Sequence, residues 1–99
     1  MCRGWSETMD ATKETQGICD QVKSLVQRKT NKIYQEFRAI KYRDRCGAGV
    51  TYLFQVCVGG PNYIHLLVFQ ALPCYGGHLE LSSVQEDKTP DDGLEPFNN

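Results

Sequence analysis

Cysteine and histidine are the residues of this 99-residue chain with most scope for chemistry. The thiols and imidazoles are Cys2, Cys19, Cys46, Cys57, Cys74, His65 and His78. Cys74 and His78 are spaced as a nucleophile–base pair could be, but catalysis also needs a third group that orients the base and a site for the oxyanion. No third partner accompanies them, and the carboxylates gather in the C-terminal tail without the pairing that acid–base work requires. We therefore predict no catalytic residues and no enzyme activity.

The cysteine spacing also argues against a metal site. No two cysteines show C-x-x-C spacing, so neither a zinc knuckle nor a thioredoxin motif is indicated. Neither Gly-Gly pair has the lysine and hydroxyl residue of a phosphate-binding loop. We predict no metal and no cofactor. The odd number of thiols and the lack of an apolar signal segment at the N-terminus favour reduced cysteines in the cytoplasm.

The charge is nearly balanced overall but unevenly placed. The formal net charge is −1, which argues against non-specific nucleic-acid binding, and no run of residues is long enough to cross a membrane. Residues 28–45 hold seven basic and two acidic residues, whereas residues 80–99 hold one basic and six acidic residues. We expect a solvated face and an acidic tail, with steering toward a partner as the alternative. Binding to nucleic acid is a third alternative, but aromatic residues are not interleaved with the basic ones as base stacking requires.

An amphipathic helix is predicted over residues 13–33. Its apolar stripe follows a 3.6-residue period through Ile18, Val22, Leu25, Val26 and Ile33, with Cys19 at its edge. Thr12 is a suitable N-cap, and Glu14 lies in the first turn, where the helix dipole favours an anion. Residues 1–11 have few apolar side chains and are expected to form an extended, mobile arm with Gly4 as its hinge.

Beyond the helix the hydrophobic period changes to two. Four strands are predicted, over residues 36–44, 50–58, 63–72 and 78–85. Short glycine-containing loops join them, so neighbouring strands should be antiparallel. Residues 86–99 form an acidic tail that Leu94 and Phe97 could dock on the sheet. The predicted fold is a single α+β domain over residues 1–99, with one long helix across a wrapped antiparallel sheet of four to five strands.

Two of the predicted loops should lie at the same end of this sheet. The loop at 45–49 joins the first two strands and the loop at 72–77 joins the last two, and alternate hairpins of a meander share an end. The N-terminal arm can reach that end if it runs back along the sheet. The three elements would then form a wedge, and loops on a rigid sheet are common places for binding residues.

Several ordered motifs add a family resemblance. Glu14-Thr15-Gln16 and Asp20-Gln21-Val22 lie at the helix start, Asn31-Lys32 precedes the first long strand, and Tyr63-Ile64-His65-Leu66 precedes Val68-Phe69-Gln70-Ala71-Leu72-Pro73. With these motifs the chain resembles the stefins, or type 1 cystatins, over nearly its whole length. The resemblance implies a cystatin-like fold and reversible, competitive, non-covalent inhibition of papain-like cysteine proteases of the cathepsin L, H and B type. It also implies a monomer, with a domain-swapped dimer hinged at residues 45–49 as the alternative.

The resemblance also implies which residues bind the protease. They are Gly4 on the arm, Arg45, Cys46, Gly47, Ala48 and Gly49 in the first hairpin, and Leu72 and Pro73 in the second. Only Ala48 and Gly49 match the usual Gln-Val-Val-Ala-Gly of the first hairpin. We therefore predict inhibition that is weaker or shifted in target. The alternative is a stefin-fold binding or structural protein with weak or no inhibition.

Cys46 suggests a second hypothesis for the same hairpin. A thiol in an exposed loop beside two arginines could be reactive, and its oxidation or glutathionylation would then switch the wedge off. The competing interpretation is an ordinary small loop residue.

Overall fold

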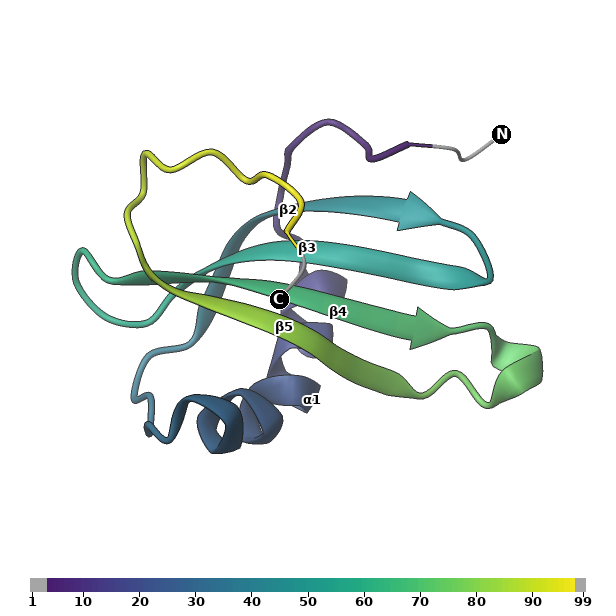
Figure 1. Cartoon of the computed structure of the whole chain (residues 1–99), viewed down its shortest axis with the longest axis horizontal. Coiled ribbons are helices and arrows are strands. Elements are labelled where there is room, and N and C mark those ends of the chain that lie inside the picture. The colour runs from purple at the N-terminus through teal and green to yellow at the C-terminus, as the bar shows by residue number, and fades with distance from the viewer. Residues whose placement is uncertain (1–3, 98–99) are drawn as a thin grey trace.

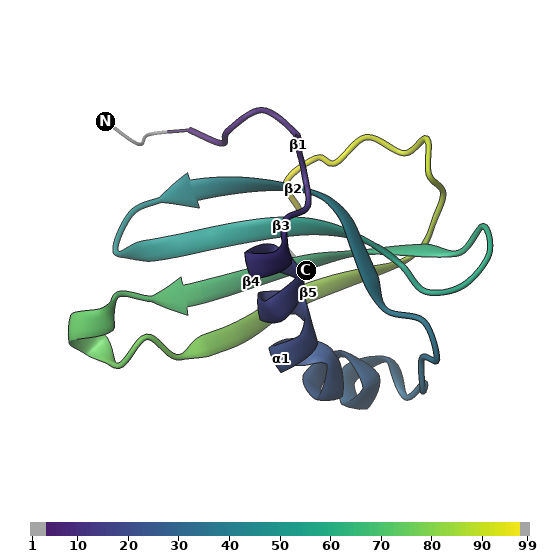
Figure 2. The ribbon, with the colours of Figure 1, turned by 180° about the vertical axis from the view of Figure 1, so that it is seen from behind.

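A computed structural model describes residues 4–97. Its elements are β1 (Met9–Asp10), α1 (Lys13–Thr30), β2 (Arg38–Cys46), β3 (Gly49–Cys57), β4 (Tyr63–Ala71), the 3-10 helix η1 (Pro73–Tyr75) and β5 (Leu79–Lys88). The five strands form one antiparallel sheet in the order β1-β2-β3-β4-β5 (Figure 1). Helix α1 lies across one face, and the segment after β5 crosses the other (Figures 1 and 2). The predicted α+β fold is confirmed.

Helix α1 begins at the predicted N-cap but ends three residues early. The Thr15 amide donates to the Thr12 hydroxyl at 3.1 Å, and the Thr12 amide donates to the Thr15 hydroxyl at 2.7 Å, which forms a capping box. Asn31 adopts a left-handed conformation with φ 59° and closes the helix on the Gln27 carbonyl. The predicted end at residue 33 is therefore wrong. Ile33, placed in the apolar stripe, is 84% exposed.

The core lies between α1 and the inner face of the sheet. It includes Cys19, Val22, Val26, Phe54, Val56, Leu66 and Val68, all fully buried. Burial of one such aliphatic side chain contributes about 1.5–3 kcal/mol to folding. Cys19, predicted at the edge of the stripe, is in the centre of the core, and its burial raises the pKa of its thiol. The helix therefore covers the inner face of the sheet through a continuous apolar core.

The tail covers part of the outer face. The Gln55 side-chain amide donates to the carbonyl of Pro90 at 3.3 Å, and Leu94 is buried. Leu53 and Gln55 of β3 do not belong to the inner-face core, yet both are buried. The cover by the tail on the outer face accounts for their burial. Leu94 docks as expected from the sequence.

The boundaries of the two terminal segments differ from those predicted. Residues 9–10 pair with β2 as strand β1, and β2 also bonds to Ser6 and Ala11, so much of the predicted arm 1–11 is attached to the sheet. Strand β5 runs to Lys88 and takes in the first residues of the predicted tail 86–99. In both cases strand pairing, a long-range interaction, extends past the local hydrophobic pattern. No helix within residues 4–97 has the length and hydropathy needed to cross a membrane.

Candidate functional site

Three segments lie at the same end of the sheet. The β2–β3 turn, the β4–β5 connection with η1, and the N-terminal arm from Gly4 onward all lie toward the same end (Figures 1 and 2). The opposite end carries the β3–β4 turn and the entry into β2. This is the arrangement that the strand order requires, because consecutive antiparallel strands reverse direction.

The β2–β3 hairpin is tighter than the predicted loop 45–49. Strand β2 continues through Arg45 and Cys46, which pair with Thr51 and Val50, because the ladder extends beyond the hydrophobic pattern. The turn closes when the Gly47 amide donates to the Gly49 carbonyl at 2.8 Å. Neither glycine has a positive φ, so the turn does not depend on the conformational freedom of glycine.

Gly49 is needed for packing instead. A Cβ built at this position would overlap the backbone carbonyl of Gln70 and lie 2.6 Å from the Phe69 ring. A Cβ at Gly47 would meet no heavy atom within 4 Å. Gly49 thus lets β4 lie close beside the hairpin, whereas the space around Gly47 would admit a side chain.

The β4–β5 connection is a compact turn held by its own backbone. The Leu72 carbonyl accepts from the amides of Tyr75 at 2.9 Å and Gly77 at 3.0 Å. Gly76 and Gly77 have φ values of 96° and 62°, which glycine adopts without strain. The turn leaves Leu72 36% and Tyr75 70% exposed. Leu72 and Pro73 line a cavity of about 340 Å³ together with Val50 of the first hairpin.

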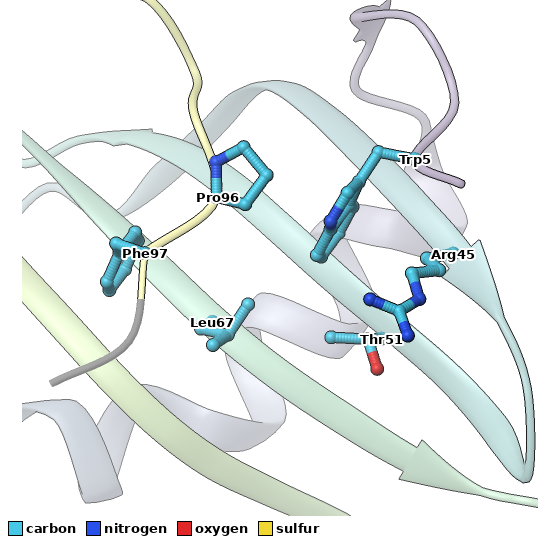
Figure 3. A pocket seen from close by; sticks show the side chains of 6 residues that line it. All are labelled: Trp5, Arg45, Thr51, Leu67, Pro96 and Phe97. Atoms are coloured by element: carbon cyan, nitrogen blue, oxygen red, sulfur yellow. The ribbon is translucent and has the colours of Figure 1, made fainter. Parts of the chain in front are cut away.

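The arm is attached to β2 just before it reaches this end. The Ser6 amide donates to the Asp44 carbonyl at 2.8 Å, and the Asp44 amide donates to the Ser6 hydroxyl at 2.9 Å. Gly4 is exposed, and Trp5 is partly buried. Trp5 lines a groove of about 440 Å³ on the outer face of the sheet together with Arg45, Thr51, Leu67, Pro96 and Phe97 (Figure 3).

The comparisons with known proteins agree with this architecture. Residues 4–91 match the Cystatin domain family. The chain belongs to the cystatin family. It is 46% identical over 94 residues to Cystatin-A1 of Sus scrofa, covering 95% of this chain and 91% of that protein. It is 47% identical over 94 residues to Leukocyte cysteine proteinase inhibitor 1 of Sus scrofa, with the same coverage. It is 41% identical over 97 residues to Cystatin-B of Homo sapiens, covering 98% of this chain and 99% of that protein.

Family membership also bears on the enzyme question. The relatives of this cystatin are named as cystatins, a stefin and a cysteine proteinase inhibitor, so the prediction that the chain is not an enzyme is confirmed. The histidine considered for a nucleophile–base pair, His78, has its Nε2 3.0 Å from the carboxylate of Glu80. His65 is buried on β4.

The basic segment of this cystatin is partly neutralised within the chain. Lys32 pairs with Glu86 at 2.6 Å and Lys41 with Asp10 at 2.7 Å. The hydrogen bond from Lys41 holds the pKa of the Asp10 carboxyl below its ordinary value. These exposed pairs add little stability, but they reduce the positive surface available to a polyanion.

Sequence reasoning missed two residues at or near the end of the sheet that carries the β2–β3 turn. Tyr75 is a large exposed side chain beside Leu72, and its position in a loop rich in proline and glycine was the available signal. Arg43, considered from the sequence only as a charge of the basic segment and as a cation near Cys46, has a side chain that is 20% exposed and bonds to two chain segments. No local pattern could have shown these partners, because they lie far away in the sequence.

Proposed function

We propose that this cystatin is a reversible, competitive, non-covalent inhibitor of papain-like cysteine proteases. The supporting observation is that the N-terminal arm, the β2–β3 turn and the β4–β5 connection share one end of the sheet in a chain of the cystatin family. A relative is named as a cysteine proteinase inhibitor, which fits the same function. The proposed place of action is the cytoplasm.

In this mechanism each segment of the wedge fills a different part of the protease cleft. Gly4 lets the arm turn into the non-primed side, residues 45–49 lie beside the catalytic thiol, and Leu72 with Pro73 rests on the primed side. Tyr75, 70% exposed on the same turn, extends this last contact. The wedge fills the cleft without placing a peptide bond within reach of the nucleophile, so the protease has nothing to cleave.

The two hairpins are formed before binding. The pairing of Cys46 with Val50 and the hydrogen bonds inside the β4–β5 turn hold both backbones in place. Little conformational entropy is then lost on docking, which favours affinity. Three hairpin residues act against affinity. Arg45 adds a cation, and Cys46 and Gly47 stand where the usual hairpin has two valines. They therefore supply less apolar contact, and the turn is less restricted than with β-branched residues. We infer weaker binding, or a shift in target among cathepsins L, H and B.

An inhibition panel tests this proposal. Purified protein is titrated against papain and cathepsins L, H and B, and the inhibition constant and competitive pattern are measured for each. Inhibition of at least one enzyme is expected. Absence of inhibition at micromolar protein would reject the inhibitor and favour a binding or structural role for the same fold.

A hairpin variant locates the cause of any weakness. Arg45→Gln, Cys46→Val and Gly47→Val are combined, and the space around position 47 and its non-positive φ allow the larger side chain. We expect tighter inhibition with an unchanged melting temperature.

Gel filtration of the same samples tests the proposed monomer. A protein that exchanges strands through a hinge at residues 45–49 would elute as a dimer.

A further inference from the structure

The Arg43 side chain joins the two ends of the chain. Its Nε donates to the carbonyl of Ser6 at 2.8 Å, and its Nη1 donates to the carbonyl of Leu94 at 2.9 Å. The Glu95 carboxylate lies 4.0 Å from Nη1. Only 20% of the Arg43 side chain is exposed, so the charge-assisted hydrogen bonds are shielded from water.

We propose that Arg43 is a positioning residue that couples the C-terminal tail to the N-terminal arm and so aims Gly4 and Trp5 at the functional end. Its effect on protease affinity rests on the proposed function. Its effect on the arm does not, since the hydrogen bonds exist within the chain alone.

The tail provides a fixed anchor for this link. Leu94 is buried against the outer face, and the Gln55 amide bonds to Pro90, so the Leu94 carbonyl is held independently of Arg43. Ser6 is the residue next to Trp5, and its amide and hydroxyl already bond to Asp44. Arg43 holds its carbonyl, so the peptide groups on both sides of Ser6 are fixed. The bond from Arg43 to the carbonyl, together with the bond from the Ser6 amide to Asp44, restricts the backbone of Ser6 and with it the direction in which Trp5 and Gly4 leave the sheet.

The side chain must be arginine for this task. A guanidinium has a rigid planar fork that donates to two acceptors at once, whereas a lysine ammonium is a single point charge on a flexible stem. We therefore expect Arg43→Lys to keep the charge but lose the simultaneous contact with Ser6 and Leu94. Arg43→Lys removes only the geometry of the link, whereas Arg43→Gln removes the geometry and the charge. Equal effects of the two substitutions would therefore show that the geometry matters.

Trp5 reports on the arm without any protease. It is the single tryptophan of the chain and lies in the groove between Arg45 and Pro96, where arm and tail approach each other (Figure 3). If Arg43 holds the arm, its loss should free Trp5 from this groove. The emission of Trp5 would then shift to longer wavelength and be quenched more strongly by acrylamide.

The first experiment measures Trp5 emission and acrylamide quenching in full-length variants. Arg43→Gln and Arg43→Lys should both raise the quenching constant, while Arg38→Gln, an exposed arginine on the same strand, should leave it unchanged. Circular dichroism confirms that each variant is folded. Unchanged quenching in a folded Arg43→Gln protein would overturn the proposal, whether or not the protein inhibits a protease.

The second experiment tests the route by which Arg43 affects affinity. In the parent chain, Arg43→Gln should weaken inhibition roughly tenfold, the scale of a lost hydrogen bond to a charged group. In a Gly4→Glu background, where the arm cannot enter the cleft, the same substitution should have no further effect. An equal loss in both backgrounds would overturn the positioning role. Absence of inhibition by the unsubstituted protein would instead reject the proposed function, and the Trp5 measurement would still decide the role of Arg43.

Discussion

The Cα of Gly49 lies so close to the backbone carbonyl of Gln70 that a side-chain carbon at position 49 would overlap the oxygen. The two residues belong to neighbouring strands, where Gly49 pairs with Ala71 at the end of the β3–β4 ladder. The Phe69 ring lies against the same glycine. The two glycines of the first hairpin therefore have different roles, since Gly49 joins the hairpin to β4 and Gly47 does not.

We predict that Gly49→Ala destabilises the protein and that Gly47→Ala does not. Overpacking against a backbone atom costs about 1–3 kcal/mol of unfolding free energy, whereas a substitution into open space stays within about 0.5 kcal/mol. Urea denaturation of the two variants measures both values. Equal stability of the two would show that β4 moves aside without cost, contrary to this account.

Tyr75 and Leu72 are predicted to affect inhibition and leave stability unchanged. Both are exposed on the β4–β5 connection, and exposed tyrosines at the centre of an interface are common hot spots. Tyr75→Ala should weaken inhibition of the most sensitive protease by roughly tenfold, equivalent to about 1.4 kcal/mol. Ile33→Ala is the matched control, because Ile33 is also exposed but lies in the connection entering β2. A loss of the same size in Ile33→Ala would argue against a localised contact.

The sequence predicts the helix start and the strand order well because both depend on local signals. Thr12 caps the helix through its own side chain, and the two-residue period of β3 marks its faces. The helix end was wrong because Ile33 fits the 3.6-residue period by spacing alone. Asn31, which readily adopts the left-handed conformation, is the local residue that stops the helix before Ile33.

The placement of the two hairpins at one end of the sheet was predicted from the sequence, and the contacts that support them were not. Hairpins at one end follow from the meander topology, so the wedge could be inferred from loop positions. The contacts of Arg43 with Ser6 and Leu94 depend on how far β2 extends and where the tail docks, and neither is encoded locally. The same holds for Gly49, whose packing partner lies on another strand.

Gln16 is predicted to contribute to stability by bonding to the start of β2. Its side-chain carbonyl accepts from the Ala39 amide at 2.8 Å, and its amide donates to the Phe37 carbonyl at 3.1 Å. Gln16→Leu would leave these backbone groups without a partner, at a cost of about 1–3 kcal/mol. Urea denaturation checks this value against Gln21→Leu, an exposed position on the same helix. Equal stability of the two variants would mean that water replaces Gln16 fully.

The cysteines are predicted to separate into two classes in a thiol-labelling experiment. Cys46 and Cys74 are exposed on the two hairpin connections, whereas Cys19 and Cys57 are buried. A Cys2→Ser protein, which removes the thiol outside the described residues, should show two fast thiols under native conditions and four in denaturant. Alkylation of Cys46 at the rate of free cysteine would remove the motive for a redox switch at the hairpin. Labelling of Cys19 at a similar rate would contradict the packed core.

His65 is predicted to make stability depend on pH. It is 1% exposed, and its Nε2 has no hydrogen-bond partner among the described residues. Burial lowers the pKa of this imidazole from 6.5 to about 4, with a further lowering by Lys88 and an opposing effect of Asp92. The folded state therefore takes up a proton less readily than the unfolded state. Stability should be unaffected by His65 above pH 6.5 and should fall as the pH drops from 6.5 toward 4.

The expected loss follows from the same difference in pKa. It is on the order of 2–3 kcal/mol once the pH has fallen from 6.5 to about 4. Urea denaturation at pH 4.5–7 measures the slope, which His65→Gln should reduce by close to one proton. His78→Gln removes the other imidazole of the chain, which is exposed, and serves as the matched control. If both variants kept the slope of the parent, the pH dependence would have to come from carboxylates. The lowered pKa assigned to His65 in the folded state would then be wrong.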